Sequence, residues 1–372
     1  MLVRYTKSKD GKAVKQAEVY TQEEHGLTLN QMDSDALFIT RKLRSAGYEA
    51  YIVGGAIRDL LLGRKPKDFD VVTDAHPRAI KKVLPFSRII GKRFRLVHVY
   101  FPDNKIIEVA TFRSNVEGDN NVFGTLEEDA KRRDFTLNAL YYCPKDQYII
   151  DQVGGVADIR RRRLVNVIPL DLIFDDDPVR MLRGIKYTTT GKLSLSSAMA
   201  SQIRKKAPLL ASMSPARLTE EFYKILFSGM SAEILQNLSK YRLLEFITQG
   251  LGQELRTGFL KPAPKELLEG LRLLDEAVKS AQEIDRASAL TFLIAPWMES
   301  KGWRSKATTE NFEDAIRLLK DFFQPLLPSN AELENALRGM YRVWAVRTPR
   351  RRPPRTRHRR PPAPSHKDPK PM

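Results

Sequence analysis

The sequence predicts an α/β head with a small mixed sheet, followed by an all-helical neck and body and a disordered basic tail. Short strand patterns alternate with helical patterns as far as about residue 160. From Asp175 onward the strand patterns nearly vanish, while helical apolar spacing continues. After residue 346 the chain is rich in arginine and proline and has no apolar periodicity, so it cannot build a core.

We expect residues 1–30 to form a flexible segment and residues 31–160 to form the head. The first predicted helix runs from Ser34 to Ala46, capped by Asp33 or Ser34 and ended by Gly47. The predicted strands of the head are YEAYIV, DFDVVT, RLVHVYF, KIIEVATFR and QYIIDQVGG. Its remaining predicted helices are AIRDLLLG, PRAIKKVL and residues 127–141.

Three further regions follow the head. Residues 161–230 are predicted to be a neck with nucleotide- and RNA-binding helices, residues 231–346 a helical body, and residues 347–372 a disordered tail. That tail holds eight Arg and two Lys against one Asp, which is half of the net charge of +18. Such an excess indicates a polyanionic partner.

Composition excludes several classes of protein. No apolar run approaches the roughly 20 residues of a membrane span, and the N-terminal residues show no apolar signal region. The single cysteine, Cys143, excludes an intramolecular disulfide and a cysteine zinc site. We therefore expect a cytoplasmic protein without a membrane partner.

Two aspartates stand at the start of the buried strand pattern DFDVV. Side chains alternate faces along a strand, so Asp68 and Asp70 should point the same way. Their repulsion is relieved if a cation lies between them or if the strand end lies in water. Gly54 and Gly55 form a turn between a strand and a helix, where a phosphate can approach the backbone. A plain turn and a solvated strand end explain each feature taken alone; together they fit nucleotidyl transfer with Mg²⁺.

The stretch GGAIRDLLLG…DFDVV resembles the signature of the class II nucleotidyltransferases, the polymerase-β-like family of tRNA CCA-adding enzymes and bacterial poly(A) polymerases. IIEVATFR (106–113), EEDAKRRDFTLNALYY (127–142), DQVGGVADI (151–159) and DDPVRMLRGIKY (176–187) match in the same order. The resemblance implies a nucleotidyltransferase head, two Mg²⁺ ions, ATP or CTP as substrate, and RNA 3′ ends as acceptor.

Site residues follow from the resemblance. It implies that Asp68 and Asp70 are metal ligands and that these two and Asp134 are catalytic. The residues expected to bind the nucleotide are Gly54, Gly55, Arg58, Arg133, Asn138, Asp177, Arg180, Arg183 and Lys186. Glu108 is a candidate third carboxylate near the acceptor hydroxyl, or an exposed strand residue.

The predicted helix 176–187 carries four charged residues three positions apart, Asp177, Arg180, Arg183 and Lys186. Neighbours in such a series lie side by side on a helix. An acceptor, Asp177, beside a donor, Arg180, matches the edge of adenine or cytosine, whereas guanine and uracil reverse it. An ion-pair ladder on the helix surface is the alternative.

Three features favour poly(A) polymerase over a CCA-adding enzyme. GKRFRLVHVYF (91–101) and residues 216–247 resemble the poly(A) branch, and so does the basic tail. Such a tail can bind RNA phosphates without sequence choice, and it is a possible contact for RNA-decay proteins. The arginines that we expect to contact RNA are Arg350, Arg351, Arg352, Arg355, Arg357, Arg359 and Arg360. The alternatives are tRNA CCA addition and a non-catalytic RNA-binding protein on the same fold.

Overall fold

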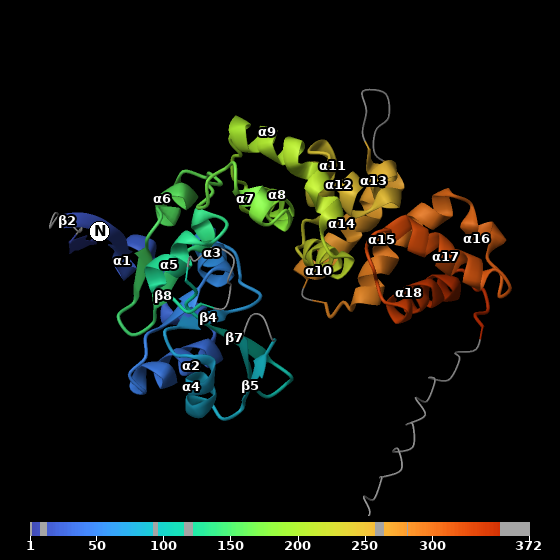
Figure 1. Ribbon diagram of the computed structural model, residues 1–372. Coiled ribbons are helices and arrows are strands. Elements are labelled where there is room, and N and C mark those ends of the chain that lie inside the picture. The colour runs from blue at the N-terminus through green and yellow to red at the C-terminus, as the bar shows by residue number, and fades with distance from the viewer. Residues whose placement is uncertain are drawn as a thin grey trace, which may run out of the picture.

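A mixed sheet organises the N-terminal half of the chain, and helices make up the remainder (Figure 1). The computed structural model describes residues 2–7, 13–91, 96–114, 122–256, 264–280 and 282–349. The strands are β1 (Leu2–Lys7), β2 (Ala13–Tyr20), β3 (Ala50–Val53), β4 (Asp70–Thr73), β5 (Ser87–Ile90), β6 (Leu96–Tyr100), β7 (Ile106–Thr111), β8 (Leu140–Cys143) and β9 (Tyr148–Asp151). Their order in the 9-stranded sheet is β1-β2-β9-β8-β3-β4-β7-β6-β5, and within the described residues only β4 and β7 pair in parallel.

The N-terminal segment differs from our expectation. Residues 13–20 form β2, which pairs with β9 through Glu18↔Asp151, so this part of 1–30 extends the sheet and is not a flexible segment. The alternating residues Ala17 and Val19 are buried. The partner strand lies far along the chain, which is why local pattern did not reveal the pairing.

The predicted helix over 127–141 is also corrected. Helix α5 (Leu126–Lys131) ends early, the 3-10 turn η2 (Thr136–Asn138) follows, and then β8 begins. All four residues of β8 are buried between β3 and β9, and this pairing overrides the local helical pattern.

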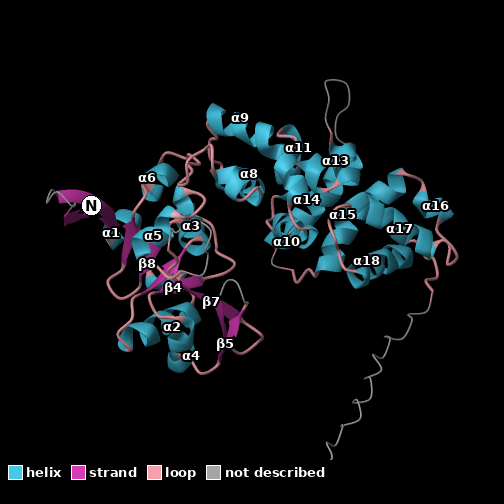
Figure 2. Ribbon diagram, viewed as in Figure 1, coloured by secondary structure: helices cyan, strands magenta, loops and turns pink. Residues whose placement is uncertain are grey.

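Helices cover the sheet unevenly. Helix α2 (Ser34–Ser45), capped by the Asp33 side chain, and helix α4 (Pro77–Val83) pack together with the apolar side chains of β3, β4, β6 and β7 in the main core. Figure 2 shows both on the same side of the head. A smaller apolar cluster on the other face joins Tyr51, Val72 and Tyr141 with Ala130 of α5. The remaining head elements are α1 (Gln22–His25), η1 (Leu29–Gln31), α3 (Gly55–Leu61) and α6 (Gly155–Arg160).

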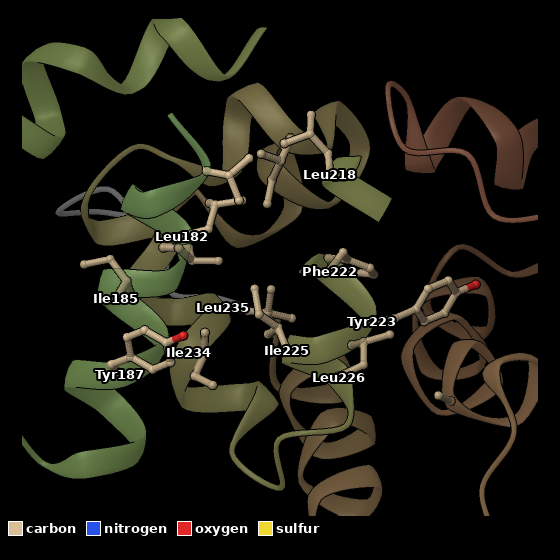
Figure 3. Packing of buried hydrophobic residues seen from close by; sticks show 14 of the residues in the cluster. Leu182, Ile185, Tyr187, Leu218, Phe222, Tyr223, Ile225, Leu226, Ile234 and Leu235 are labelled. Carbon is tan, nitrogen blue, oxygen red and sulfur yellow. The ribbon is translucent and has the colours of Figure 1, made fainter. Parts of the chain in front are cut away.

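The predicted all-helical neck and body are confirmed, because no strand follows β9 in the part of the chain that the structure describes. The helices are α7 (Ile173–Asp176), α8 (Val179–Gly191), α9 (Ser197–Lys206), η3 (Ala207–Ser212), α10 (Pro215–Leu226), α11 (Ser231–Lys240), α12 (Leu244–Ile247), α13 (Gln249–Leu255), α14 (Lys265–Lys279), α15 (Arg286–Ser300), α16 (Trp303–Lys306), α17 (Phe312–Phe323) and α18 (Asn330–Val343). Figure 3 shows how α8, α10 and α11 pack through Leu182, Phe222 and Leu235. No helix among the described residues is long and apolar enough to span a bilayer.

Candidate active site

The exposed carboxylates lie where β4 begins. Asp70 is the first residue of β4, whereas Asp68 lies two residues before the strand. We expected both side chains to follow the alternation of one strand, but only Asp70 belongs to the strand. The parallel pair Val71↔Val109 places Glu108 of β7 beside Asp70. All three side chains are exposed.

The electrostatics of Asp70 show the crowding at this strand end. Although the side chain reaches solvent, partial desolvation by the surrounding protein, together with the charges of Glu108 and Asp68, raises the pKa of Asp70 to about 6. Arg133 and Lys224 oppose the rise. A divalent cation would relieve this repulsion, and two carboxylates plus substrate phosphates are a usual Mg²⁺ environment. The residues therefore fit Mg²⁺, although no cluster of three or more potential metal-binding side chains occurs within the described ranges.

The glycine turn leads from β3 into α3. Gly54 has φ +71° and ψ −123°, a conformation that side-chain-bearing residues rarely adopt. A Cβ atom on Gly54 would lie 3.5 Å from Arg133 Nη1, so the backbone here passes close to a guanidinium. The turn therefore lies beside one of the arginines that we expected at the nucleotide.

Arg133 is held within the head by three partners. Its guanidinium donates to Asp129 Oδ2 at 2.8 and 3.1 Å, to the Tyr141 hydroxyl at 3.1 Å and to the Asn138 carbonyl at 3.1 Å. Burial opposes the charge, but Tyr141 and Asp129 hold the pKa of Arg133 above its usual range. Asp129 was not among the predicted site residues, although its spacing of four from Arg133 within the predicted helix 127–141 was a signal for this pair.

Asn138 connects the turn region to the neck. Its side-chain amide donates to Asp134 Oδ1 at 2.9 Å, and its Oδ1 accepts from Arg58 at 2.8 Å. The guanidinium carbon of Arg58 lies 4.4 Å from the centre of the Tyr187 ring of α8. These contacts explain why Arg58 and Asn138, far apart in the sequence, belong to one network.

Asp134 is a buried member of the same network. Its Oδ1 also accepts from the Phe135 backbone N–H at 2.8 Å, and its Oδ2 lies 3.0 Å from Arg183 Nη2 without hydrogen-bond alignment. Although burial favours the neutral acid, Arg183, Asn138 and the Phe135 N–H hold the pKa of Asp134 below its usual range. Its contacts are thus those of a residue that joins head and neck.

The helix predicted over 176–187 is interrupted. Helix α7 ends at Asp176, Asp177 is extended with φ −150° and ψ 97°, and α8 begins at Val179. Pro178 is the physical reason, because a proline disfavours helical geometry in the preceding residue. The Asp177 Oδ1 accepts from the Val179 N–H at 3.2 Å.

Asp177 and Arg180 have different partners in this structure. Arg217 of α10 donates to Asp177 Oδ2 at 2.5 Å, while Arg180 pairs with Asp176 at 2.5 Å and donates to the Ile173 carbonyl. The two side chains therefore do not form the isolated acceptor–donor pair that the spacing suggested. Arg217, which lies in the segment 216–247 that resembles the poly(A) branch, belongs to this site.

Lys186 points to another residue of α10. Its Nζ lies 3.7 Å from Glu221 Oε2, and Lys224 pairs with Glu221 Oε1 at 3.1 Å. Burial opposes ionisation of Glu221, but Lys186 and Lys224 hold its pKa below the usual range. Lys67 of the head donates to the Phe227 carbonyl just after α10, so head and neck also meet here. The tail arginines at 350–360 lie outside the described residues.

Two family descriptions match parts of the chain. The poly A polymerase head domain matches residues 50–165, and residues 192–255 match the "Probable RNA and SrmB- binding site of polymerase A". Poly(A) polymerase I of Salmonella typhi is 41% identical over 244 residues, which are 61% of this chain and 52% of that enzyme. The CCA-adding enzyme of Bacillus pumilus (strain SAFR-032) is 31% identical over 297 residues, which are 78% of this chain and 71% of that enzyme.

A solved structure extends the similarity to the body. The crystal structure of the Bacillus stearothermophilus CCA-adding enzyme in complex with CTP has a TM-score of 0.58 and 28% identity, and the match covers 84% of this chain and 83% of that one. The chain spans about half the length of the Salmonella typhi poly(A) polymerase that it matches. These matches confirm the predicted head followed by a helical body.

Proposed function

The chain belongs to the class II nucleotidyltransferases, the family of bacterial poly(A) polymerases and tRNA CCA-adding enzymes, and on that premise we propose that it adds adenosine to RNA 3′ ends without a template. In each step the RNA 3′-oxygen forms a bond to the α-phosphorus of ATP. The bond from that phosphorus to the bridging oxygen breaks, and pyrophosphate leaves. The observation that carries the proposal is the carboxylate group of Asp68, Asp70 and Glu108 beside the glycine turn.

The carboxylates and the glycine turn have separate roles in this proposal. Asp68 and Asp70 would hold two Mg²⁺ ions, which when bound stabilise the charge that develops during phosphoryl transfer. Glu108 is placed on the strand next to Asp70, where it can accept a hydrogen bond from the RNA 3′-hydroxyl. The turn at Gly54 allows the triphosphate to approach the backbone, and Arg133 beside it supplies positive charge.

Nucleotide choice is assigned to the start of α8. The Asp177 carboxylate would accept from the adenine amino group, and Arg180 would donate to a ring nitrogen. The Asp177 carboxylate can still accept a hydrogen bond from adenine while it pairs with Arg217, because each carboxylate oxygen accepts more than one hydrogen bond. Asp134 would act as a positioning residue that holds Arg183 and Asn138.

ATP is favoured over CTP by size in this proposal. A pyrimidine leaves part of a purine-sized site unfilled, at a cost of roughly 1–3 kcal/mol. The 41% identity to a poly(A) polymerase supports adenosine addition. CCA addition is the second candidate, supported by the similarity to CCA-adding enzymes over most of the chain.

The proposed partners and location follow the same reasoning. The tail arginines would bind RNA phosphates without sequence choice, in a cytoplasmic enzyme that acts on messenger RNA among other transcripts. A contact of the tail with RNA-decay proteins is the remaining partner proposal.

A 3′-extension assay tests the function. Each of the four nucleotides is offered alone and in mixture, with Mg²⁺, to an unstructured RNA and to a tRNA that lacks its 3′ end, and the products are sequenced. We expect runs of adenosine on both RNAs. Addition of C, C and A to the tRNA alone would establish the CCA-adding alternative, and no addition to any RNA would favour the non-catalytic one.

The matched variants are Asp68→Ala and Asp70→Ala. Both should lose transfer while retaining the fold, because the side chains are exposed and each loss removes charge stabilisation worth several kcal/mol in the transition state. Glu269→Ala, an exposed carboxylate of α14, is the control and should leave transfer unchanged. Near-normal transfer by either aspartate variant would refute the site.

A further inference from the structure

One row of side chains runs from the candidate active site to the edge of the sheet. Asp70 of β4 lies beside Glu108 of β7, Glu108 is opposite His98 of β6, and His98 is opposite Arg88 of β5. Residues directly opposite one another in neighbouring strands point to the same face. The row therefore crosses four strands on one face of the sheet.

The neighbouring rows of this face are exposed and partly apolar. Tyr100 is 36% exposed, Ile106 opposite it is 47% exposed, and Ile90 is 38% exposed. The alternate residues Val97 and Val109 are fully buried on the other side. The face of β5, β6 and β7 that carries Arg88, His98, Tyr100 and Glu108 is called the outer face below.

The outer face combines an aromatic ring with a cation. The guanidinium carbon of Arg88 lies 5.7 Å from the centre of the Tyr100 ring, and the His98 ring lies 6.4 Å from it. Aromatic rings beside arginine are the groups on which single-stranded nucleic acid stacks. His98 Nε2 lies 3.2 Å from Glu108 Oε1, so the imidazole can orient this carboxylate while its second oxygen stays available to the RNA.

Sheet order separates this face from the nucleotide. The glycine turn at Gly54 follows β3, whereas Glu108 lies on β7, and β4 with Asp70 runs between them. In an in-line transfer the attacking 3′-oxygen and the leaving pyrophosphate lie on opposite sides of the α-phosphorus, which the metal-binding residues must flank. With the triphosphate on the β3 side, the acceptor must approach over β7. Figure 2 shows β5 and β7 at the side of the head away from the N-terminal strand.

We propose that the outer face binds the last nucleotides of the acceptor RNA. Tyr100 stacks a base near the 3′ end, Arg88 contacts a phosphate, and His98 positions Glu108 toward the terminal hydroxyl. This inference rests on the proposed function, because it assigns the second substrate of the same site. It also gives a role to His98 and Tyr100 of β6.

Steady-state kinetics with a short oligoadenylate test the assignment. Tyr100→Ala should raise the RNA KM about five- to tenfold, at the low end of what base stacking contributes, and leave the ATP KM within about twofold. Tyr100→Phe keeps the ring and should restore a wild-type RNA KM. Arg88→Ala should raise the RNA KM and lower its salt dependence.

The control for Arg88→Ala is Arg272→Ala on α14, which removes an arginine that is 62% exposed far from the sheet. It should leave both KM values unchanged. An RNA KM within twofold of wild type for both outer-face variants would overturn the proposal. A dimer in sedimentation that Tyr100→Ala dissolves, with the RNA KM unchanged, would also overturn it and assign the face to a second copy of the chain.

A crosslink separates this inference from the proposed function. Oligoadenylate ending in 4-thiouridine is irradiated with the wild-type chain, and crosslinked peptides are identified by mass spectrometry. A crosslink within residues 87–100 supports the outer face even if the chain transfers no nucleotide. Active extension with crosslinks confined to the helical body would refute the outer face and leave the proposed function standing.

Discussion

Asp134→Ala should destabilise the junction between head and neck more than it perturbs any chemistry. The carboxylate accepts two buried hydrogen bonds, from the Phe135 N–H at 2.8 Å and from the Asn138 amide at 2.9 Å. It is also the counter-ion of Arg183, which lies 3.0 Å away. Removing it leaves all three donors without this acceptor.

The expected magnitude follows from these contacts. Each buried donor left without an acceptor costs about 1–3 kcal/mol. The Arg183 side chain is 32% exposed, so water can solvate it and its lost pairing adds about 1 kcal/mol or less. We therefore expect Asp134→Ala to lower the free energy of local unfolding by about 2–7 kcal/mol. Asp134→Asn retains the Oδ1 acceptor and should cost about 1 kcal/mol.

The pH dependence has a defined sign. Because the folded protein holds the pKa of Asp134 below its usual range, ionised Asp134 stabilises the fold at any pH above the ordinary carboxyl pKa of about 3.9. That contribution is lost as the pH falls through the lower pKa of the folded state. Asp134→Asn should show a weaker acid dependence of stability than the wild-type chain.

Hydrogen exchange measured by mass spectrometry is the assay. Peptides that cover 134–143 and 179–191 should lose protection from exchange in Asp134→Ala. The three tryptophans, Trp297, Trp303 and Trp344, all lie in the body, so unchanged tryptophan fluorescence serves as the control that the body remains folded. Unchanged exchange in both peptides would refute this account of the junction. Unchanged exchange with transfer abolished would instead make Asp134 a participant in the chemistry.

Three other perturbations have definite expected results. Gly270→Ala places a Cβ 2.2 Å from the Phe292 carbonyl oxygen, so α14 and α15 must separate. We expect about 1–3 kcal/mol of destabilisation, measured by tryptophan fluorescence during urea unfolding, and an unshifted unfolding midpoint would contradict it. Asp177→Ala should blur the choice among nucleotides in single-nucleotide extension, because Arg180 alone cannot read the amino group; retained selectivity would place the choice elsewhere. Removing residues 350–372 should weaken RNA binding and flatten its salt dependence while transfer to a saturating primer persists, since fewer phosphates are neutralised; unchanged affinity at low salt would favour a protein-docking tail.

The candidate site was partly predictable because several of its signals are local. The glycine turn, Asp68, Asp70 and the strand with Glu108 are each short patterns, and the alternation of IIEVAT predicts the face of Glu108 without any tertiary contact. The residues that hold these groups were not predictable in the same way. The spacing of four allowed the pair of Asp129 with Arg133, but only the structure shows that it forms, and Arg217 is recognised only when the structure brings it to Asp177.

Long-range pairing accounts for the errors in the fold. Residues 13–20 and 140–143 carry weak local patterns. The first segment becomes a strand because it forms backbone hydrogen bonds with β9, and the second because it forms them with β3 on one side and β9 on the other. Pro178 was a local signal that the predicted helix over 176–187 should break, since it restricts Asp177 to an extended conformation.

By itself the sequence determined the succession of an α/β head and a helical body, because apolar periodicity reports which side of each segment must be buried. It also determined the identities of the exposed carboxylates and the glycine turn. Only the tertiary structure decided that β4 lies between β3 and β7, that Asp134 joins Arg183 to Asn138, and that Arg217 reaches Asp177. The reason is that these contacts join elements distant in the chain, and which elements meet is determined by the packing of the whole core.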